Sequence, residues 1–532
     1  MTDSTPATSP DLFCPSKQEN KSPDDLEGTP EIDLERLGRS RPVLLPNAPI
    51  EIGFVLSTIG SLMMSEYFIS GFNVVLPQLS EALDIPESLR TWPAGVPSLT
   101  TAALLLPFAR LGDQYGARWV FICGHAWLLV WSIVSGFSKS STMLIVSRAM
   151  QGVGAGAFMP TAVSLLSNIY RPGPRKNLVF GLYGACGCLG FYVGILIAGI
   201  CAQLINWSWF FWIGGICEAV VLFCGLLTIP KKFEHGNPNV HMDWYGLFTI
   251  VPGLCLAIYA LTDGGHAPDG WRSPRIYVTF IAGALLLLAA LYVEGWVAVD
   301  PLLPPDLFRV RYMRRITFGL LCTYGVFGLF LFYGTFYFET VLHTTPIQTA
   351  LWFTPLAGGG IVLAILGGFI LHLVPGRVLL VFAGVTFIPS AMLLALMPEQ
   401  SADGEPSRAF LYWAYIFPGM LCATLGVDTI FNVTNVFITT SMPSRFQAAT
   451  GGLMTSLLYL SITLWLGVAE VAISTAVDQR DRSEIKPLEQ YRIAFWLGTG
   501  LAVTSTLLFL TVKLGNASSA LTADEKEEQV SP

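Results

Sequence analysis

Charged residues are scarce in this sequence. Asp, Glu, Lys and Arg make up 13% of the 532 residues, against roughly 25% in ordinary soluble domains, which excludes a water-soluble enzyme. Positive charge is in shorter supply than negative charge, because 30 Lys and Arg face 37 Asp and Glu for a net charge of -7. Most of the negative excess lies in the two polar tails, so no basic surface is left for nucleic acid. We therefore expect no nucleic-acid partner.

Cysteine is too sparse and too scattered to build a disulfide framework. Nine of the ten Cys residues lie inside apolar runs, and their spacing is not that of a metal site. The sequence also contains no P-loop and no nucleophile motif. We therefore expect no metal, no cofactor and no enzyme activity, and ATP-driven transport is excluded.

Long apolar runs dominate the chain instead, since 53% of its residues are hydrophobic. A helix needs about 20 apolar residues to cross a bilayer, and fourteen segments meet that criterion. They are 52–79, 92–110, 119–137, 142–168, 178–203, 209–229, 244–262, 275–297, 315–338, 347–371, 378–397, 410–440, 447–476 and 492–513. The sequence therefore predicts an all-α polytopic membrane protein with 14 transmembrane helices, embedded in a lipid bilayer.

The basic residues of the loops indicate the orientation. An even number of spans places both termini on one side, and the loops on that side hold thirteen Lys and Arg, against nine on the other side. Four of those nine lie in the last long loop. By the positive-inside rule both termini are cytosolic. The polar residues 1–49 are expected to form a disordered cytosolic tail, and residues 514–532 a second cytosolic tail.

The loop after the second span carries an ordered motif. It reads Ala109-Arg-Leu-Gly-Asp113-Gln-Tyr-Gly116-Ala-Arg118. Gly116 permits a tight turn, and Asp113 can bind a helix N-terminus or a guanidinium. This stretch closely resembles the signature loop of the major facilitator superfamily, although the first Gly and two basic residues of that pattern are replaced. The resemblance implies the major facilitator fold and a gating loop built on Asp113, Gly116 and Arg118.

Two further spans carry glycine motifs similar to those of the superfamily. The fourth reads Arg148-Ala-Met-Gln-Gly152-Val-Gly-Ala-Gly156, and the family associates this Arg with proton transfer. The fifth departs from the antiporter motif, because Gly190 and Gly194 remain while Phe and Ile replace its Pro and last Gly. Small residues let helices approach closely, so these four glycines are predicted helix-packing positions. The departure leaves the direction of transport open.

Motifs in the middle and near the end of the chain resemble those of one branch of the superfamily. Asp243-Trp-Tyr-Gly246 opens a pair of extra spans and looks like the fourteen-span drug:proton antiporter family. The stretch around Asp428, with Met442-Pro-Ser-Arg445 after it, is similar to the fungal branch of aminotriazole-resistance and boron-efflux transporters. The resemblance implies a 6 + 2 + 6 arrangement. Its parts are a six-helix bundle over 50–229, two inserted helices over 230–300 and a second six-helix bundle over 301–513.

Charged side chains near the middle of apolar spans are the candidates for proton coupling. Glu66, Arg148 and Asp428 lie in three different spans, and each charge costs roughly 2.5–3.5 kcal/mol in lipid. They are therefore expected to line a polar cavity or to pair. Glu66 is favoured as the proton carrier, with Arg148 as its cationic partner. Asp428 is either the alternative carrier or a substrate-binding group.

Other polar groups in the spans have simpler interpretations. Glu218, on a span that is usually peripheral in the family, and His125, in the third span, are more often structural. Glu470 lies near an outer span end and is expected to be solvated. The residues expected to line the substrate cavity are Gln151, Asn73, Trp352, Phe353 and Asn432. For each aromatic ring, packing in lipid or in the core is the competing interpretation.

These features predict a secondary active transporter that exports a small toxic compound, a drug or a secondary metabolite by proton antiport with alternating access. The alternative is proton-coupled or facilitated uptake of a small polar solute, and a different class is a membrane receptor or scaffold without transport. The expected partners are protons and a small-molecule substrate. We expect a monomer in the plasma membrane, with the vacuolar membrane as the alternative location.

Overall fold

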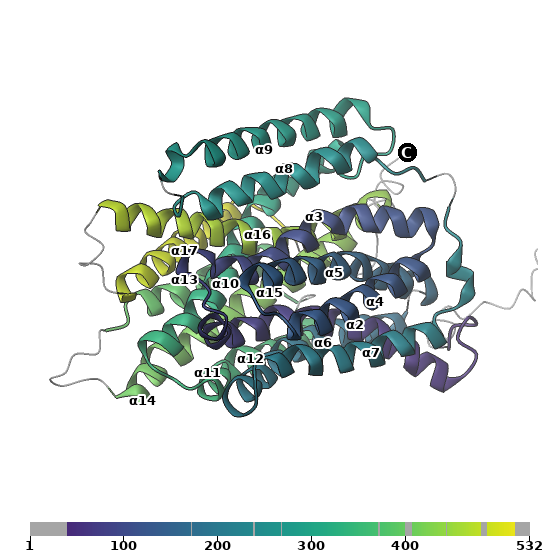
Figure 1. Cartoon of the computed structure of the whole chain (residues 1–532). Helices are drawn as coiled ribbons and strands as arrows, with labels where there is room; N and C mark the ends of the chain where they lie inside the picture. Colours follow the sequence, from purple (N-terminus) through teal and green to yellow (C-terminus); the bar gives the residue numbers. More distant parts are fainter. Residues whose placement is uncertain are drawn as a thin grey trace, which may run out of the picture.

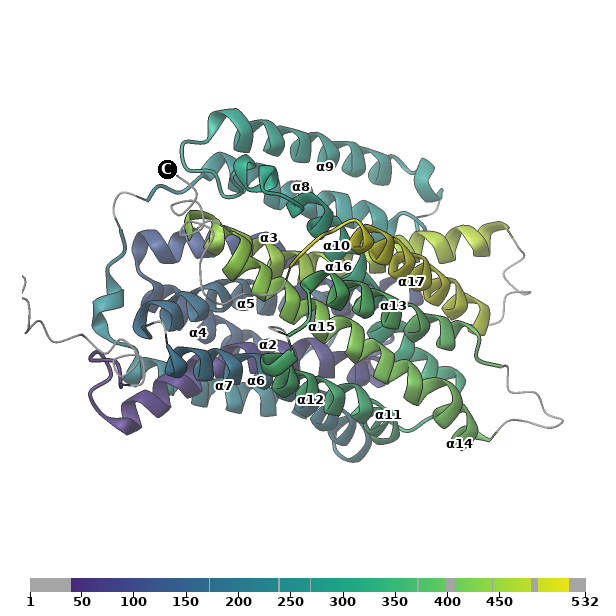
Figure 2. The same cartoon turned by 180° about the vertical axis from the view of Figure 1, so that it is seen from behind.

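The computed structural model describes residues 40–171, 173–237, 240–267, 269–370, 373–398, 407–442, 444–479 and 487–515. These residues form helices, turns and loops, and no strand occurs among them. Thirteen of the helices in this part of the chain are long and apolar enough to cross a membrane. They run side by side as one elongated bundle (Figures 1 and 2). The chain is an integral membrane protein.

The first half of the bundle contains six of these helices. They are α2 (Ala48–Ala82), α3 (Thr91–Tyr115), α4 (Ala117–Gly136), α5 (Ser141–Ile169), α6 (Pro174–Leu204) and α7 (Ser208–Thr228). Helix α2 packs along α6 and α7, whereas α3 and α4 pack along α5, and α4 also packs on α7. The buried residues are drawn from all six helices and form one continuous core.

The second half repeats this pattern of contacts. Its helices are α10 (Met313–Phe336), α11 (Pro346–Trp352), α12 (Thr354–Ile370), α13 (Gly376–Ala395), α14 (Arg408–Leu411), α15 (Phe417–Ser441), α16 (Ser444–Gln479) and α17 (Pro487–Leu510). Helix α10 packs along α16 and α17, as α2 does along α6 and α7. Helices α12 and α13 pack along α15, as α3 and α4 do along α5. By this correspondence α15 is the counterpart of α5, as expected of an internal structural repeat.

The two halves meet along two seams. Helix α3 packs on α16, and α6 packs on α11 and α12. We call the end of the bundle where α2 begins the terminal end, because the segment after α17 also returns there, where Gly515 accepts a hydrogen bond from the backbone of Gly376 at 2.9 Å. The opposite end is the distal end.

Helices α8 (Trp244–Asp263) and α9 (Pro274–Tyr292) form a hairpin beside the bundle. Figure 1 shows α8 above α3 and α16, with α9 outermost. Ring contact between Trp92 on α3 and Tyr259 on α8, 5.8 Å between centroids, fixes one side of this packing. Because α8 lies against both α3 and α16, the hairpin covers one of the two seams between the halves.

The tenth predicted span, 347–371, is not one helix. Helix α11 ends at Trp352, a turn follows at Phe353, and α12 begins at Thr354. Pro355 has no backbone N–H to continue the α11 hydrogen-bond ladder, although proline is tolerated in the first turn of a new helix. The thirteen apolar helices therefore match the other thirteen predicted spans, and the tenth span is divided between two shorter helices.

The predicted N-terminal tail is shorter than its proposed boundary at residue 49. Residues 40–47 are described, Leu45 is fully buried, and α2 already begins at Ala48. The polar composition of this stretch hid the fact that it folds against the terminal end of the bundle. Residues 1–39 and 516–532, the rest of both predicted tails, lie outside the described residues.

Candidate functional site

Glu66 on α2 is bound by a side chain from the other half of the molecule. Its Oε1 accepts a hydrogen bond from the hydroxyl of Tyr459 on α16 at 3.2 Å. The same hydroxyl lies 3.3 Å from Ser65 Oγ on α2. Tyr459 is buried and Glu66 is half-buried. The carboxyl therefore lies at the junction of the two halves, and the contact joins α2 to α16.

Asp428 on α15 lies within electrostatic range of Glu66. Its Oδ2 accepts a hydrogen bond from Thr424 Oγ1, one turn earlier on the same helix, at 2.6 Å. Its Oδ1 lies 4.0 Å from the Sγ of Cys188 on α6. The two carboxyls thus come from different halves of the bundle and interact electrostatically.

Only neutral groups contact these two carboxyls in the described part of the chain. The contacting groups are the hydroxyls of Tyr459 and Thr424 and the thiol of Cys188. The phenols of Tyr183 and Tyr324 lie within electrostatic range of Glu66 and Asp428, respectively. Burying a carboxylate without a cation is costly. The arrangement can therefore bind a proton, or a cationic or hydrogen-bond-donating ligand.

Arg148 on α5 does not pair with Glu66 in this structure, contrary to the sequence-based expectation. Its Nε donates to the backbone oxygen of Pro93 at 3.1 Å, and its Nη1 donates to Oε1 of Gln151 at 2.8 Å. The guanidinium lies 4.0 Å above the ring of Phe72. Gln151 in turn donates to Ser132 Oγ at 3.2 Å. The cation is held within the first half, and its Nη2 has no partner among the described residues.

A small cavity of about 20 Å³ adjoins Arg148. Gln151 and Gly152 line it from α5, and Ser65 and Ile69 line it from α2. Because Glu66 directly follows Ser65, this cavity lies beside the helix segment that carries the carboxyl. The structure thus brings Arg148 and Gln151 next to the Glu66 segment without direct contact between the charges.

At the terminal end, the loop between α3 and α4 contacts helix α7 and the connection that follows α7. Gly116 has φ of 105°, a left-handed value that favours glycine. The backbone oxygen of Asp113 accepts from the Asn237 backbone N–H at 2.8 Å, while the Asp113 side chain is exposed. Arg118 is mostly buried and donates to the Leu226 oxygen at 3.2 Å. A contact of the Asp113 side chain with a helix N-terminus is not among the described contacts and stays a prediction.

The predicted packing glycines lie where helices approach most closely. A Cβ at Gly190 would lie 2.3 Å from the backbone oxygen of Met63, and one at Gly194 would lie 2.6 Å from that of Tyr67. At Gly152 a Cβ would lie 2.2 Å from the oxygen of Pro97 on α3. Gly156 is less crowded, because its nearest neighbour would be 3.4 Å away.

The remaining cavity candidates are not all gathered around the carboxyls. Trp352 and Phe353 are buried in an aromatic cluster of the second half, where Trp352 stacks on Tyr412 with 5.5 Å between centroids. Asn73 is buried and donates to the Ile69 backbone oxygen at 2.8 Å. Asn432 is half-buried one turn after Asp428 on the same face of α15. Asn432 shares a helix face with Asp428 on α15, and Asn73, seven residues after Glu66, shares a helix face with Glu66 on α2.

Sequence reasoning missed the partners of the charged groups. Thr424 could have been recognised, because it lies four residues before Asp428 and must share its helix face. Tyr459 sits in an apolar run with no local signal for its role. Glu470 was expected to be solvated and is instead 8% exposed, with hydroxyl and imidazole partners. Glu218 and His125 form a fully buried pair, 2.5 Å between Oε1 and Nδ1.

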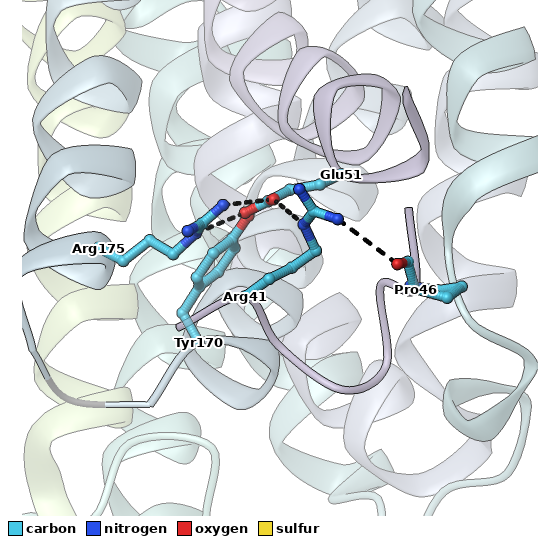
Figure 3. Close-up of polar contacts among 5 residues, drawn as sticks. All are labelled: Arg41, Pro46, Glu51, Tyr170 and Arg175. Atoms are coloured by element: carbon cyan, nitrogen blue, oxygen red, sulfur yellow. Dashed lines mark hydrogen bonds and ion pairs between the residues drawn. The ribbon is translucent and has the colours of Figure 1, made fainter. Parts of the chain in front are cut away.

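A second polar cluster fastens the start of α2. Figure 3 shows the Glu51 carboxylate surrounded by Arg175, Tyr170 and Arg41. Arg175 donates through Nε at 2.7 Å and through Nη2 at 2.5 Å, and Arg41 donates to Oε2 at 3.1 Å. The cluster joins α2 to Tyr170, directly after α5, and to Arg175, in the first turn of α6. Through Arg41, it also holds the segment before α2 against that helix.

Comparison with known proteins places the chain among transporters. The model of the Major Facilitator Superfamily matches residues 58–466. The chain is 28% identical to the efflux pump terJ of Aspergillus terreus, over 86% of this chain and 87% of that protein. It is 30% identical to the low affinity ammonium transporter of Saccharomyces cerevisiae, over 77% and 78% of the two chains. The aminotriazole resistance protein of the same yeast is 27% identical, over 81% and 78%.

Solved structures share the fold at low sequence identity. The peptide transporter POT in complex with sulfate matches 90% of this chain and 97% of its own chain, with a TM-score of 0.63 and 14% identity. At this identity the likeness concerns the fold alone. It agrees with the two-half helical bundle described above.

Proposed function

The chain belongs to the Major Facilitator Superfamily, and from that premise we propose that this transporter exports a small toxic compound, a drug or a secondary metabolite by proton antiport. The single observation that carries the proposal is the pair of carboxyls, Glu66 and Asp428, which come from opposite halves of the bundle and lie within electrostatic range of each other. Relatives named as efflux pumps and a resistance protein support export. The fungal drug-transporter branch is the family that the sequence motifs resemble.

The proposed architecture is 14 transmembrane helices arranged 6 + 2 + 6. The repeated contact pattern of the two halves supports it, with α11 and α12 together as the tenth span. The bundles extend over 50–229 and 301–513, and the inserted helices over 230–300. The excess of Lys and Arg in terminal-end loops supports cytosolic termini. We place the transporter in the plasma membrane as a monomer.

Proton coupling, in this proposal, follows from the position of Glu66 on a seam that must open. Its partner Tyr459 belongs to the other half, so separation of the halves breaks the hydrogen bond between them. A carboxyl that loses its hydroxyl partner on opening and gains water can release or bind a proton. Closing again without a cation nearby favours a neutral carboxyl pair. Protonation and closure are thereby linked.

Substrate binding is assigned to the same central region. Asp428 and Asn432 present polar groups from one face of α15, and Thr424 orients the Asp428 carboxylate. A substrate with a hydrogen-bond donor or a positive charge can bind to the Asp428 carboxylate. Arg148 and Gln151 lie on α5, the counterpart of α15 in the first half. Their hydrogen bond to each other stabilises the side of the central region that the first half contributes. Glu66 would carry the proton while Asp428 selects the substrate.

Uptake of a small polar solute is a second candidate function. The specific observation in its favour is the low affinity ammonium transporter of yeast, at 30% identity over 77% of this chain. The altered glycine motif of α6, in which Phe191 replaces the proline of the antiporter pattern, points the same way. Both candidates use the same two carboxyls and differ in the direction of net substrate movement.

A growth screen tests the proposed function. The full chain is expressed in a toxin-sensitive yeast and exposed to many toxic compounds, borate and aminotriazole included. Export predicts resistance to at least one compound, and uptake predicts hypersensitivity. An Asp113→Asn strain with equal surface abundance serves as the transport-impaired control. Unchanged growth on every compound, despite correct surface expression, would favour a receptor or scaffold over a transporter.

A further inference from the structure

Glu470 on α16 joins three parts of the molecule at the distal end. Its Oε1 accepts a hydrogen bond from Thr91 Oγ1, at the start of α3, and another from the Tyr333 hydroxyl on α10 at 3.0 Å. Its Oε2 lies 3.0 Å from Nε2 of His266, in the turn between α8 and α9. One carboxylate thus binds the first half, the second half and the inserted hairpin. Glu470 on α16 and its partner Tyr333 on α10 both belong to the second half, so Thr91 and His266 supply the connections that cross between parts.

The cluster is shielded from solvent. Glu470 is 8% exposed, and Thr91 and Tyr333 are each 4% exposed. The His266 side chain retains 19% exposure, which leaves it reachable from the distal side. Partly buried ion pairs are screened by salt much less than exposed pairs. This site therefore differs from the many surface ion pairs that contribute little to stability.

The turn that carries His266 is seated directly on α16. A Cβ at Gly265 would lie 1.8 Å from Ser474 Oγ, one helical turn after Glu470. Trp92, next to Thr91, packs its ring on Tyr259 of α8. His266 therefore lies on a turn that is packed against the bundle. Its position relative to Glu470 is set by the packing of the hairpin on both α3 and α16.

We propose that Glu470 and His266 form a latch that holds the distal end closed, and that the inserted hairpin serves to supply the latch's cation. The proposal rests on alternating access in the proposed function. Opening of the distal end separates α3 from α16, which breaks the bond from Thr91 to Glu470. The hairpin packs on both helices, so it must slide on one of them as the seam opens. The His266–Glu470 pair is the polar contact that such sliding strains.

The charge of His266 makes the latch sensitive to pH on the distal side. The hydrogen bond and charge of Glu470 raise the pKa of His266, and partial burial opposes them. The charges of Asp263 on α8 and of Glu87 in η2 (Glu87–Leu89) also raise the pKa of His266. Arg275 of α9 is paired with Asp263 at 2.7 Å, and Tyr491 of α17, near Arg90, faces Glu470 from the other side.

The sign of the effect follows from this raised pKa. The ion pair is complete below the ordinary pH range of histidine titration and is lost as the pH rises through the raised pKa of His266. Protonation of Glu470 in strong acid removes the pair as well. The latch is therefore strongest at mildly acidic pH and weakest in alkali. An acidic medium on the distal side would keep that end closed until substrate or proton movement at the centre opens it.

The test measures opening directly rather than transport. Spin labels at Lys139→Cys and Arg408→Cys, exposed positions at the distal ends of the two halves, report the distance between them in the full chain in nanodiscs. The native cysteines are replaced by Ser in every variant, because a thiol-reactive label would also modify the exposed ones. We expect the wild type to shift toward longer distances between about pH 6 and about pH 9. Glu470→Gln and His266→Gln should each raise the ratio of open to closed molecules about tenfold at the lower pH. Both should also lose the pH response.

His241→Gln is the matched control. His241 precedes the same hairpin at its other end and faces Asp300 at 3.5 Å with its side chain 72% exposed. It should leave the distances and their pH response unchanged. Tyr333→Phe keeps the ring and removes one hydrogen bond, so it should shift the ratio in the same direction by several-fold. Tyr333→Phe takes the place of Glu470→Gln in the test if Glu470→Gln does not give monodisperse protein.

Two results would overturn the latch. One is an unchanged distance distribution in both the Glu470 and the His266 variants. The other is an equal shift in His241→Gln, which would make the effect non-specific. Failure of the proposed function is distinguishable, because a wild-type protein that moves no substrate in liposomes would still show the distance change and its loss in the two latch variants.

Discussion

Individual side chains decide how closely the helices of the first half can pack. On α6, Gly190 and Gly194 face the backbone of α2, so any side chain there would displace a neighbouring helix. Gly181 and Gly184 lie on the same helix and have open space around the Cβ position. Glycine in a helix costs about 1 kcal/mol relative to alanine. The contrast within α6 therefore separates glycines that packing requires from glycines that it does not.

Gly194→Ala is predicted to destabilise the fold by about 1–3 kcal/mol, because its Cβ would overlap the Tyr67 backbone oxygen. Gly181→Ala is the matched control and should be neutral or slightly stabilising, since it gains helix propensity without a clash. Thermal unfolding of the purified proteins in detergent measures both. Equal stability of the two variants would contradict the packing assignment.

The buried pair of His125 and Glu218 gives a second prediction at this scale. Both side chains are fully buried, and His125 also stacks on Phe158 with 4.1 Å between centroids. Removing one member of a buried polar pair typically costs about 3–5 kcal/mol, so Glu218→Leu should lower stability by that amount. Adding His125→Phe should recover part of the loss. Val220→Ala, on the exposed face of the same helix, controls for general effects, and a null result for Glu218→Leu would speak against a structural role.

At the scale of helices, the sequence predicts the spans well because apolar length alone defines them. Thirteen of the predicted spans correspond to apolar helices of the described chain. The break at Phe353 could not be seen from hydropathy, because Pro355 does not change the apolar character of the run. It is visible only when the missing backbone donor is considered. Likewise, the tail boundary was placed by polarity, whereas the Glu51 cluster, through Arg41, holds the segment before α2 against that helix.

The connection between α3 and α4 carries a prediction about gating. Asp113→Asn keeps the shape of the side chain and removes its charge, so folding and targeting should be unaffected. If Asp113 stabilises closure of the terminal end against a helix N-terminus, the interaction is worth about 0.3–2 kcal/mol. Its loss should cut the transport rate several-fold.

Efflux by the Asp113→Asn variant, measured at equal surface abundance, tests this assignment. Asp306→Asn is the control, because Asp306 is an exposed aspartate paired with Arg309 at 2.8 Å in another terminal-end loop. Normal efflux from Asp113→Asn, or an equal defect in the control, would contradict a specific gating role.

At the scale of the whole molecule, the charged residues of the candidate site could be picked out from the sequence, but their partners on other helices could not. An isolated Glu or Asp in an apolar run is conspicuous because lipid makes it costly. The meeting of Glu66 with Tyr459, 393 residues apart, depends on how the halves pack. The same holds for Arg148, whose hydrogen bond to the backbone oxygen of Pro93 follows from the α3–α5 contact. The separation of two residues in the sequence does not indicate which helices pack together.

The central claim is that movement of the halves is coupled to protons through Glu66, with Asp428 reserved for the substrate. The direct measurement uses the purified protein in liposomes with a compound found in the growth screen. Accumulation driven by a pH gradient is compared with counterflow exchange of the same compound, for the wild type, Glu66→Gln and Asp428→Asn. Counterflow needs no net proton release, so it separates coupling from binding.

The account predicts that Glu66→Gln, which mimics a permanently protonated carboxyl, abolishes gradient-driven accumulation and retains counterflow. Asp428→Asn should retain gradient-driven accumulation with a lowered apparent affinity for substrate. The reverse pattern would exchange the two roles. Full gradient-driven accumulation in both variants would contradict the claim that coupling runs through this pair of carboxyls.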